Sequence, residues 1–157
     1  TTIMIKVNVL SEENSWSKKI KKKELFFNKI CNKFPKKYRF INKKIYLTLL
    51  LSNNKKIKIL NKKFRNKNRH TDVLSFPFNK KQKKLKENYL GDIIISFNYI
   101  NKPNLDNYEF KIKTIKIFIH GFLHLLGHDH QKSKEYKQML NEEKKIFRSI
   151  EKTSILN

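Results

Sequence analysis

The sequence has little cysteine, and it lacks long apolar runs. Its one cysteine, Cys31, cannot form an intrachain disulfide. No apolar stretch approaches the roughly 20 residues that a membrane helix needs, and no charged start is followed by an apolar run with a small-residue cleavage site. These absences predict a protein of the reducing cytoplasm that has no membrane partner.

Acidic residues are also few: 13 Asp and Glu stand against 37 Lys and Arg, which gives a formal net charge of +24. So much charge of one sign predicts a polyanionic partner such as RNA. Lysine, asparagine and isoleucine are abundant while alanine is absent, so part of the lysine excess reflects an AT-rich genome. Only four basic residues are arginine. An arginine kept against this bias, such as Arg65, indicates a need for its planar fork of donors.

Histidine, by contrast, is concentrated: four of the five lie in the segment HGFLHLLGHDH, from His120 to His130. Apolar residues at three- and four-residue steps before and within this segment predict a helix, on which His120 and His124 share one face. Gly127 can end that helix and return His130 to the same point. Three histidine ligands leave one coordination position open, as in catalytic rather than structural zinc sites.

Two other classes of protein remain open. The spacing of the histidines is also that of the long zinc-protease motif. However, that motif carries its general-base glutamate directly after the first histidine, where this sequence has Gly121. A non-catalytic, metal-stabilised factor that binds RNA or the ribosome would explain the charge, but it would leave the open metal position unused.

The histidine segment resembles the signature of the bacterial YbeY family of metal-dependent endoribonucleases. His120, His124 and His130 fall on that family's metal ligands, whereas His128 departs from the tyrosine that the family often has. Two further blocks, Leu60–Phe78 and Leu90–Ser96, are similar to the family, and in the first of them Arg65 matches its functional arginine.

The resemblance implies an activity, a cofactor and partners. The expected activity is cleavage of single-stranded RNA in 16S rRNA 3′-end maturation and ribosome quality control. The expected cofactor is one Zn²⁺ held by His120, His124 and His130, with Arg65 as the catalytic residue. The expected partners are single-stranded RNA, rRNA and ribosomal subunits, and DNA is not expected to be one.

The remaining elements are predicted from apolar spacing and from proline. Pro77 restricts its strand to an edge position, and the nearly continuous apolar run of Ile45–Leu51 predicts a central strand covered on both faces. The lysine-rich segment Asn79–Asn88 has no apolar period and is expected to be a solvated loop. The predicted strands are Thr2–Leu10, Ile45–Leu51, Thr71–Phe78 and Leu90–Phe97. The predicted helices are one long helix at Ser15–Phe34, one around Ile57, Leu60 and Phe64 that ends near Arg65 to Asn68, the histidine helix and a C-terminal helix.

These elements predict the α+β class, because helices lie between and after the strands without regular alternation. A chain of 157 residues is long enough for one core, so residues 1–157 are expected to form a single domain. The family resemblance implies a zincin-like mixed sheet of about four strands covered by helices. The histidines would then face a cleft beside the edge strand at 71–78.

Overall fold

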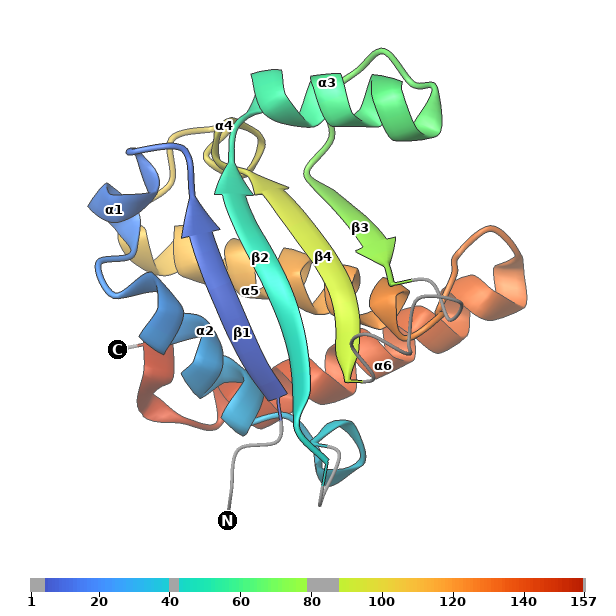
Figure 1. The fold of residues 1–157 in the computed structure, drawn as a ribbon. Coiled ribbons are helices and arrows are strands. Elements are labelled where there is room, and N and C mark those ends of the chain that lie inside the picture. Colours follow the sequence, from blue (N-terminus) through green and yellow to red (C-terminus); the bar gives the residue numbers. More distant parts are fainter. Residues whose placement is uncertain (1–4, 40–42, 79–87, 157) are drawn as a thin grey trace.

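A computed structural model describes residues 5–39, 43–78 and 88–156. Its four-stranded sheet has the order β1 (Ile5–Ser11), β2 (Ile45–Ser52), β4 (Tyr89–Ser96), β3 (Val73–Pro77). The first three of these strands are parallel, and β3 runs antiparallel to β4 at the edge (Figure 1). The predicted α+β fold with a mixed sheet is therefore confirmed, as is the edge position of the strand that contains Pro77. The expected loop at 79–88 lies, apart from Asn88, outside the described residues.

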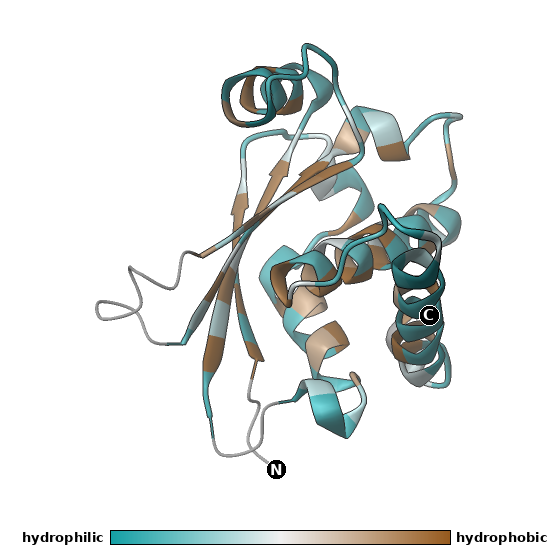
Figure 2. Cartoon of the chain, turned by 90° about the vertical axis from the view of Figure 1, so that its right-hand side faces the viewer, coloured by the Kyte–Doolittle hydropathy of each residue, from teal (hydrophilic) through white to brown (hydrophobic). Residues whose placement is uncertain are grey.

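The helix at Asn54–Arg65 covers one end of one face of the sheet, and the other helices lie on the opposite face (Figure 2). Residues Phe118, Ile119 and Phe122 of the central helix α5 are fully buried there. The helical elements are α1 (Trp16–Lys19), α2 (Lys23–Asn32), the 3₁₀ turn η1 (Lys36–Tyr38), α3 (Asn54–Arg65), α4 (Phe97–Ile100), α5 (Asn107–Leu125), α6 (Ser133–Glu151) and the 3₁₀ turn η3 (Ser154–Leu156). In the part of the chain that the structure describes, no helix combines the length and apolar character needed to cross a membrane.

The predicted long helix at Ser15–Phe34 is wrong, because the chain breaks between α1 and α2. Ile20 has extended backbone angles and is buried. The break lets the two short helices pack in different directions: Trp16 of α1 contacts Phe97 and donates from Nε1 to the carbonyl oxygen of Ser52 at 2.9 Å, whereas Phe27 of α2 packs on Phe118. The apolar spacing is nearly continuous across the break, so the sequence pattern alone does not reveal it.

The prediction that both faces of the strand at Ile45–Leu51 are covered is also wrong. This strand, β2, is central, and its alternate residues Ile45, Leu47, Leu49 and Leu51 are buried under the helices. The opposite face carries Tyr46, which is 42% exposed. On that face α3 covers only the end of the sheet, where Ile57 packs with Leu74 and Ile94. The nearly continuous apolar run of β2 therefore contributes to the main core on one face of the sheet and to a small cluster on the other face.

The histidine helix, α5, has defined ends. Asp106 caps its first turn by accepting a hydrogen bond from the backbone N–H of Glu109 at 2.8 Å. Leu126 ends it, and Gly127 follows with a φ of +97°, a left-handed conformation that glycine adopts without strain. The predicted stop at Gly127 is thus confirmed. This ending turns the chain back toward the last turn of α5, beside strand β3.

Candidate metal centre

Three imidazoles meet at the C-terminal end of α5. His120 and His124 lie one turn apart on the helix, and His130 returns to them from the segment that follows Gly127. One nitrogen from each ring lies within 4.8 Å of the others. The reversal is fixed by two backbone hydrogen bonds, from Gly127 to the carbonyl of His124 and from His128 to that of Leu123, each 3.0 Å long.

Hydrogen bonds to the outer ring nitrogens orient two of these imidazoles. Nδ1 of His120 lies 2.6 Å from Oε1 of Glu143, and Nδ1 of His124 lies 2.8 Å from the carbonyl oxygen of His128. With each Nδ1 donating outward, the Nε2 atoms of His120 and His124 face each other at 3.0 Å. Such partners fix the tautomer in which Nε2 has a free lone pair for a metal.

The ionisation of His124 favours metal binding. Burial lowers the pKa of His124 below that of a free imidazole, and the neighbouring His120 lowers it further. The carbonyl of His128 raises the pKa in part but does not cancel the decrease. His124 is therefore neutral near pH 7, which is the form that binds a metal ion.

The donor set fits a divalent ion of the zinc type. Three imidazoles, two of which have outer hydrogen-bond partners, match the three-histidine sites in which one coordination position stays open. His120 and His124 are partly buried and His130 is exposed, so the cluster is accessible from one side. The structure thus brings together all three histidines that the sequence analysis selected as ligands.

Glu143 is the site residue that the sequence analysis missed. It lies on α6, 23 positions after His120, in the segment that the sequence analysis predicted only as a C-terminal helix. No local spacing links Glu143 to the histidine motif, so no sequence signal within this chain could have assigned it. Asp129, which is adjacent to a ligand in sequence, instead accepts from the backbone N–H of His130 at 2.7 Å, and its carboxylate lies 3.6 Å from that ring.

We expect Glu143→Ala to weaken metal binding about 10- to 100-fold, the usual loss when a partner of a metal-ligating histidine is removed. The ring of His120 would lose the acceptor that fixes its orientation. Glu143→Gln keeps a neutral acceptor and should lose less. Metal affinity can be measured by competition with a chromophoric chelator, using Glu151→Ala on the same helix as the control. If Glu143→Ala bound the metal as tightly as this control, the assignment of Glu143 would be wrong.

A groove of about 700 Å³ leads from the histidines along β3. One wall is the end of α5 with the segment 127–131, and the other is β3 with the segment that precedes it. Arg65, the last residue of α3, also lines this groove. Its Nη2 donates to the carbonyl of Ser75 at 2.7 Å, and its guanidinium lies 5.5 Å from the ring centre of Phe76. The structure therefore places the predicted Arg65 in the same groove as the histidines.

Gly121 fits a narrow space between α5 and the sheet. A Cβ at this position would lie 3.0 Å from Cγ2 of Ile93, 3.1 Å from Oγ of Ser75 and 3.2 Å from Cγ2 of Val73. The Ser75 hydroxyl also donates to the Gly121 carbonyl at 2.9 Å, which ties β3 to the helix. A larger side chain after His120 would therefore require these neighbouring side chains to shift, and glycine allows the close contact as it stands.

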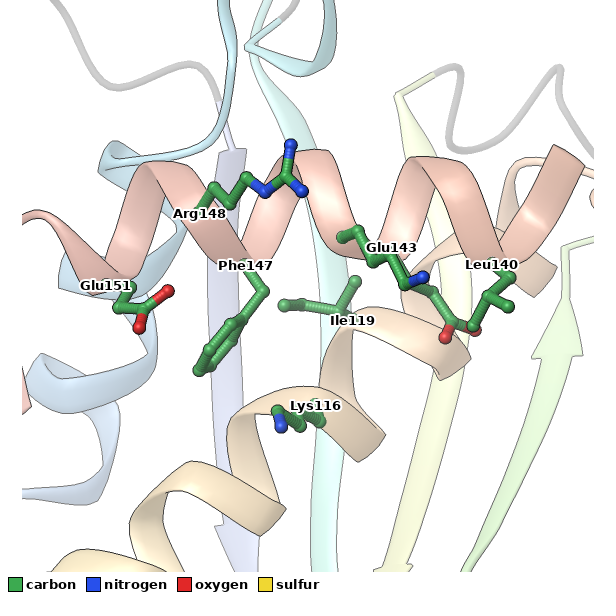
Figure 3. Close-up of a pocket in the computed structure, with 8 residues that line it drawn as sticks. Lys116, Ile119, Leu140, Glu143, Phe147, Arg148 and Glu151 are labelled. Atoms are coloured by element: carbon green, nitrogen blue, oxygen red, sulfur yellow. The ribbon is translucent and has the colours of Figure 1, made fainter.

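A second groove, of about 400 Å³, lies between α5 and α6 (Figure 3). Glu143 is part of its lining, together with Ile119, Leu140 and Phe147. Nζ of Lys116 lies 4.9 Å from the centre of the Phe147 ring. The Glu143 carboxylate therefore lies between the side chains of the α5–α6 groove and the histidine cluster.

The fold and the site define an α+β protein whose three-histidine cluster can hold a metal ion and opens into a groove beside an edge strand. The family model described as Endoribonuclease YbeY matches residues 9–151. Accordingly, the chain belongs to the YbeY endoribonuclease family.

Relatives named Endoribonuclease YbeY match most of the chain. The one from Pelagibacter ubique (strain HTCC1062) is 64% identical over 148 residues, which cover 94% of this chain and 97% of the relative. The one from Buchnera aphidicola is 41% identical over 131 residues, covering 82% and 81%. The solution structure of TM1509 from Thermotoga maritima aligns over 98% of this chain and 96% of its own, with 21% identity and a TM-score of 0.47.

Proposed function

We propose that this chain is a zinc-dependent endoribonuclease that cleaves single-stranded RNA, with a role in 16S rRNA 3′-end maturation and ribosome quality control. The observation that carries the proposal is one groove that contains three convergent imidazoles and an arginine with a fixed side chain. Membership of the YbeY family supports the RNA substrate. The proposal places residues 1–157 in the cytoplasm as one catalytic domain that acts on rRNA in ribosomal subunits.

The residues of the groove have different roles in the proposed reaction. A zinc ion held by His120, His124 and His130 would lower the pKa of its water to about 7 and so provide a nucleophile near neutral pH. Arg65 presents donors to a phosphodiester in the groove. Because the Ser75 carbonyl and the Phe76 ring hold the guanidinium, its remaining N–H groups are oriented before the substrate binds. Glu143 and the His128 carbonyl keep the two helical histidines in the ligating tautomer.

The packing of Gly121 argues against a metalloprotease. Peptide hydrolysis in that class uses a glutamate directly after the first histidine. At position 121 a Cβ would already be crowded by side-chain atoms of Val73, Ser75 and Ile93, so a glutamate there would require these neighbours to shift. A phosphodiester can instead be stabilised by the metal and by Arg65, and this combination favours RNA over peptide.

In the test, untagged protein is incubated with single-stranded RNA, with the matching DNA or with an unfolded polypeptide, each with and without a chelator. We expect one zinc per chain and chelator-sensitive cleavage of the RNA alone. A 2′-deoxy substitution at the cut site reports the nucleophile, since unchanged cleavage favours attack by water over attack by the 2′-hydroxyl. Proteolysis without RNA cleavage would overturn the proposal in favour of the protease. Tight ribosome binding with neither activity would favour a non-catalytic, metal-stabilised factor.

A further inference from the structure

An exposed aromatic pair lines the groove beside the start of β3. Tyr99 of α4 and His70, in the segment between α3 and β3, have ring centres 5.9 Å apart at an interplanar angle of 73°. Both residues line the groove, Tyr99 is 42% exposed, and His70 is exposed. A ring that served only the core would be covered, as that of Phe97 on the same helix is.

Contacts with the sheet show that this pair lies beside the start of β3, whereas the last turn of α5 reaches the other end of that strand. The backbone N–H of Ser96 donates to the carbonyl of Asp72 at 3.0 Å, so the start of α4 is next to the start of β3. Leu125, by contrast, lies against Gly91, which pairs with Pro77 at the other end. The intervening residues of β3 span about 10 Å at 3.3 Å per residue, a length that a few nucleotides can cover.

Hydrogen bonds from α3 hold the two segments that carry the rings. Asn61, which is 2% exposed, donates from Nδ2 to the carbonyl of Arg69 at 2.9 Å and so holds the segment that carries His70. At the start of α3, the backbone N–H of Asn54 donates to Oδ1 of Asn98 at 3.0 Å and so holds the helix of Tyr99. A surface that is ordered before binding loses less conformational entropy when a ligand arrives.

We infer that Tyr99 and His70 form a stacking platform for an unpaired nucleobase of the RNA that occupies the groove. The inference rests on the proposed function and adds a binding subsite to it. Flat rings on the wall of a basic groove are how proteins bind single-stranded RNA with little sequence preference. Arg69 lines the same end of the groove and supplies positive charge for the adjacent phosphate. A base paired in a duplex cannot reach the platform, so the subsite selects unpaired RNA.

The test measures binding of a short unstructured RNA to chelator-treated protein by fluorescence anisotropy, so that no cleavage is required. Base-aromatic stacking is worth about 1–3 kcal/mol per base, and Tyr99→Ala should therefore weaken binding roughly 5- to 150-fold. Tyr99→Phe should bind within about twofold of the unmodified protein, because the ring is kept. Tyr99→Leu keeps an apolar side chain without the ring and should bind as poorly as Tyr99→Ala. Tyr108→Ala, at a more exposed tyrosine on the first turn of α5, is the matched control and should bind normally.

An abasic nucleotide moved along the RNA identifies the stacked position. At one position the abasic nucleotide should weaken binding to the unmodified protein as much as Tyr99→Ala does. The same RNA should bind the Tyr99→Ala variant little more weakly than intact RNA does, because each change removes the same contact. Normal binding by Tyr99→Ala and Tyr99→Leu, or losses that add at every position, would overturn the inference. Cleavage with normal binding by these variants would refute the platform alone, whereas Tyr99-dependent binding without any cleavage would refute the proposed activity alone.

Discussion

His124→Ala should lose bound metal and RNA cleavage together. Cleavage should fall by more than about 100-fold, beyond the range for outer partners of a ligand. The substitution removes both the Nε2 atom that would bind the metal and the hydrogen bond from Nδ1 to the His128 carbonyl. The fold should survive, since an open site with three ligands contributes less to folding than a closed structural site. Metal content by elemental analysis, cleavage rate and circular dichroism together measure the three effects.

The matched control for His124→Ala is His128→Ala. His128 orients His124 through its backbone carbonyl, which alanine retains, and its own side chain is not part of the three-histidine cluster. Its metal content should therefore equal that of the unmodified protein. If His124→Ala retained full metal stoichiometry, the cluster would not be the metal site. Loss of the helical signal in the same variant would show that the site is structural and would weaken the case for an enzyme.

Arg65→Lys should bind RNA nearly normally but cleave it about 100-fold or more slowly at saturating RNA. Lysine keeps the positive charge, which dominates affinity for the phosphate backbone. It cannot reproduce a planar fork that stacks on Phe76, donates to Ser75 and still offers donors to a phosphate. Removal of one oriented donor at a developing negative charge typically costs a factor of about 100 to 1,000 in kcat.

Arg148→Lys is the control for Arg65→Lys, because Arg148 lies on α6 in the lining of the second groove (Figure 3). Its kcat and its affinity for RNA should be unchanged. Equal kcat for Arg65→Lys and the unmodified protein would demote Arg65 to a cation at the C-terminal end of α3, where a positive charge is favoured by the helix dipole. A loss of affinity without a loss of kcat would assign Arg65 to binding alone.

Several features of this protein were predictable because they depend on residues close together in the chain. The histidine cluster needs only one helical turn between His120 and His124 and one reversal at Gly127, and both are encoded within eleven residues. Pro77 places its strand at the sheet edge because proline has no N–H to donate to a second neighbour. Local geometry and local hydrogen-bonding capacity are thus determined by the sequence itself.

Other features were decided only by the tertiary structure, because they join residues that are distant in sequence. Glu143 reaches His120 from another helix, and Tyr99 meets His70 only where α4 lies beside the start of β3. The break at Ile20 follows from the different packing of α1 and α2, which apolar periodicity cannot distinguish from one straight helix. The sequence by itself therefore determined which side chains meet at the end of α5. The assembly of sheet and helices decided what orients those side chains and which groove they face, because these contacts depend on packing between distant segments.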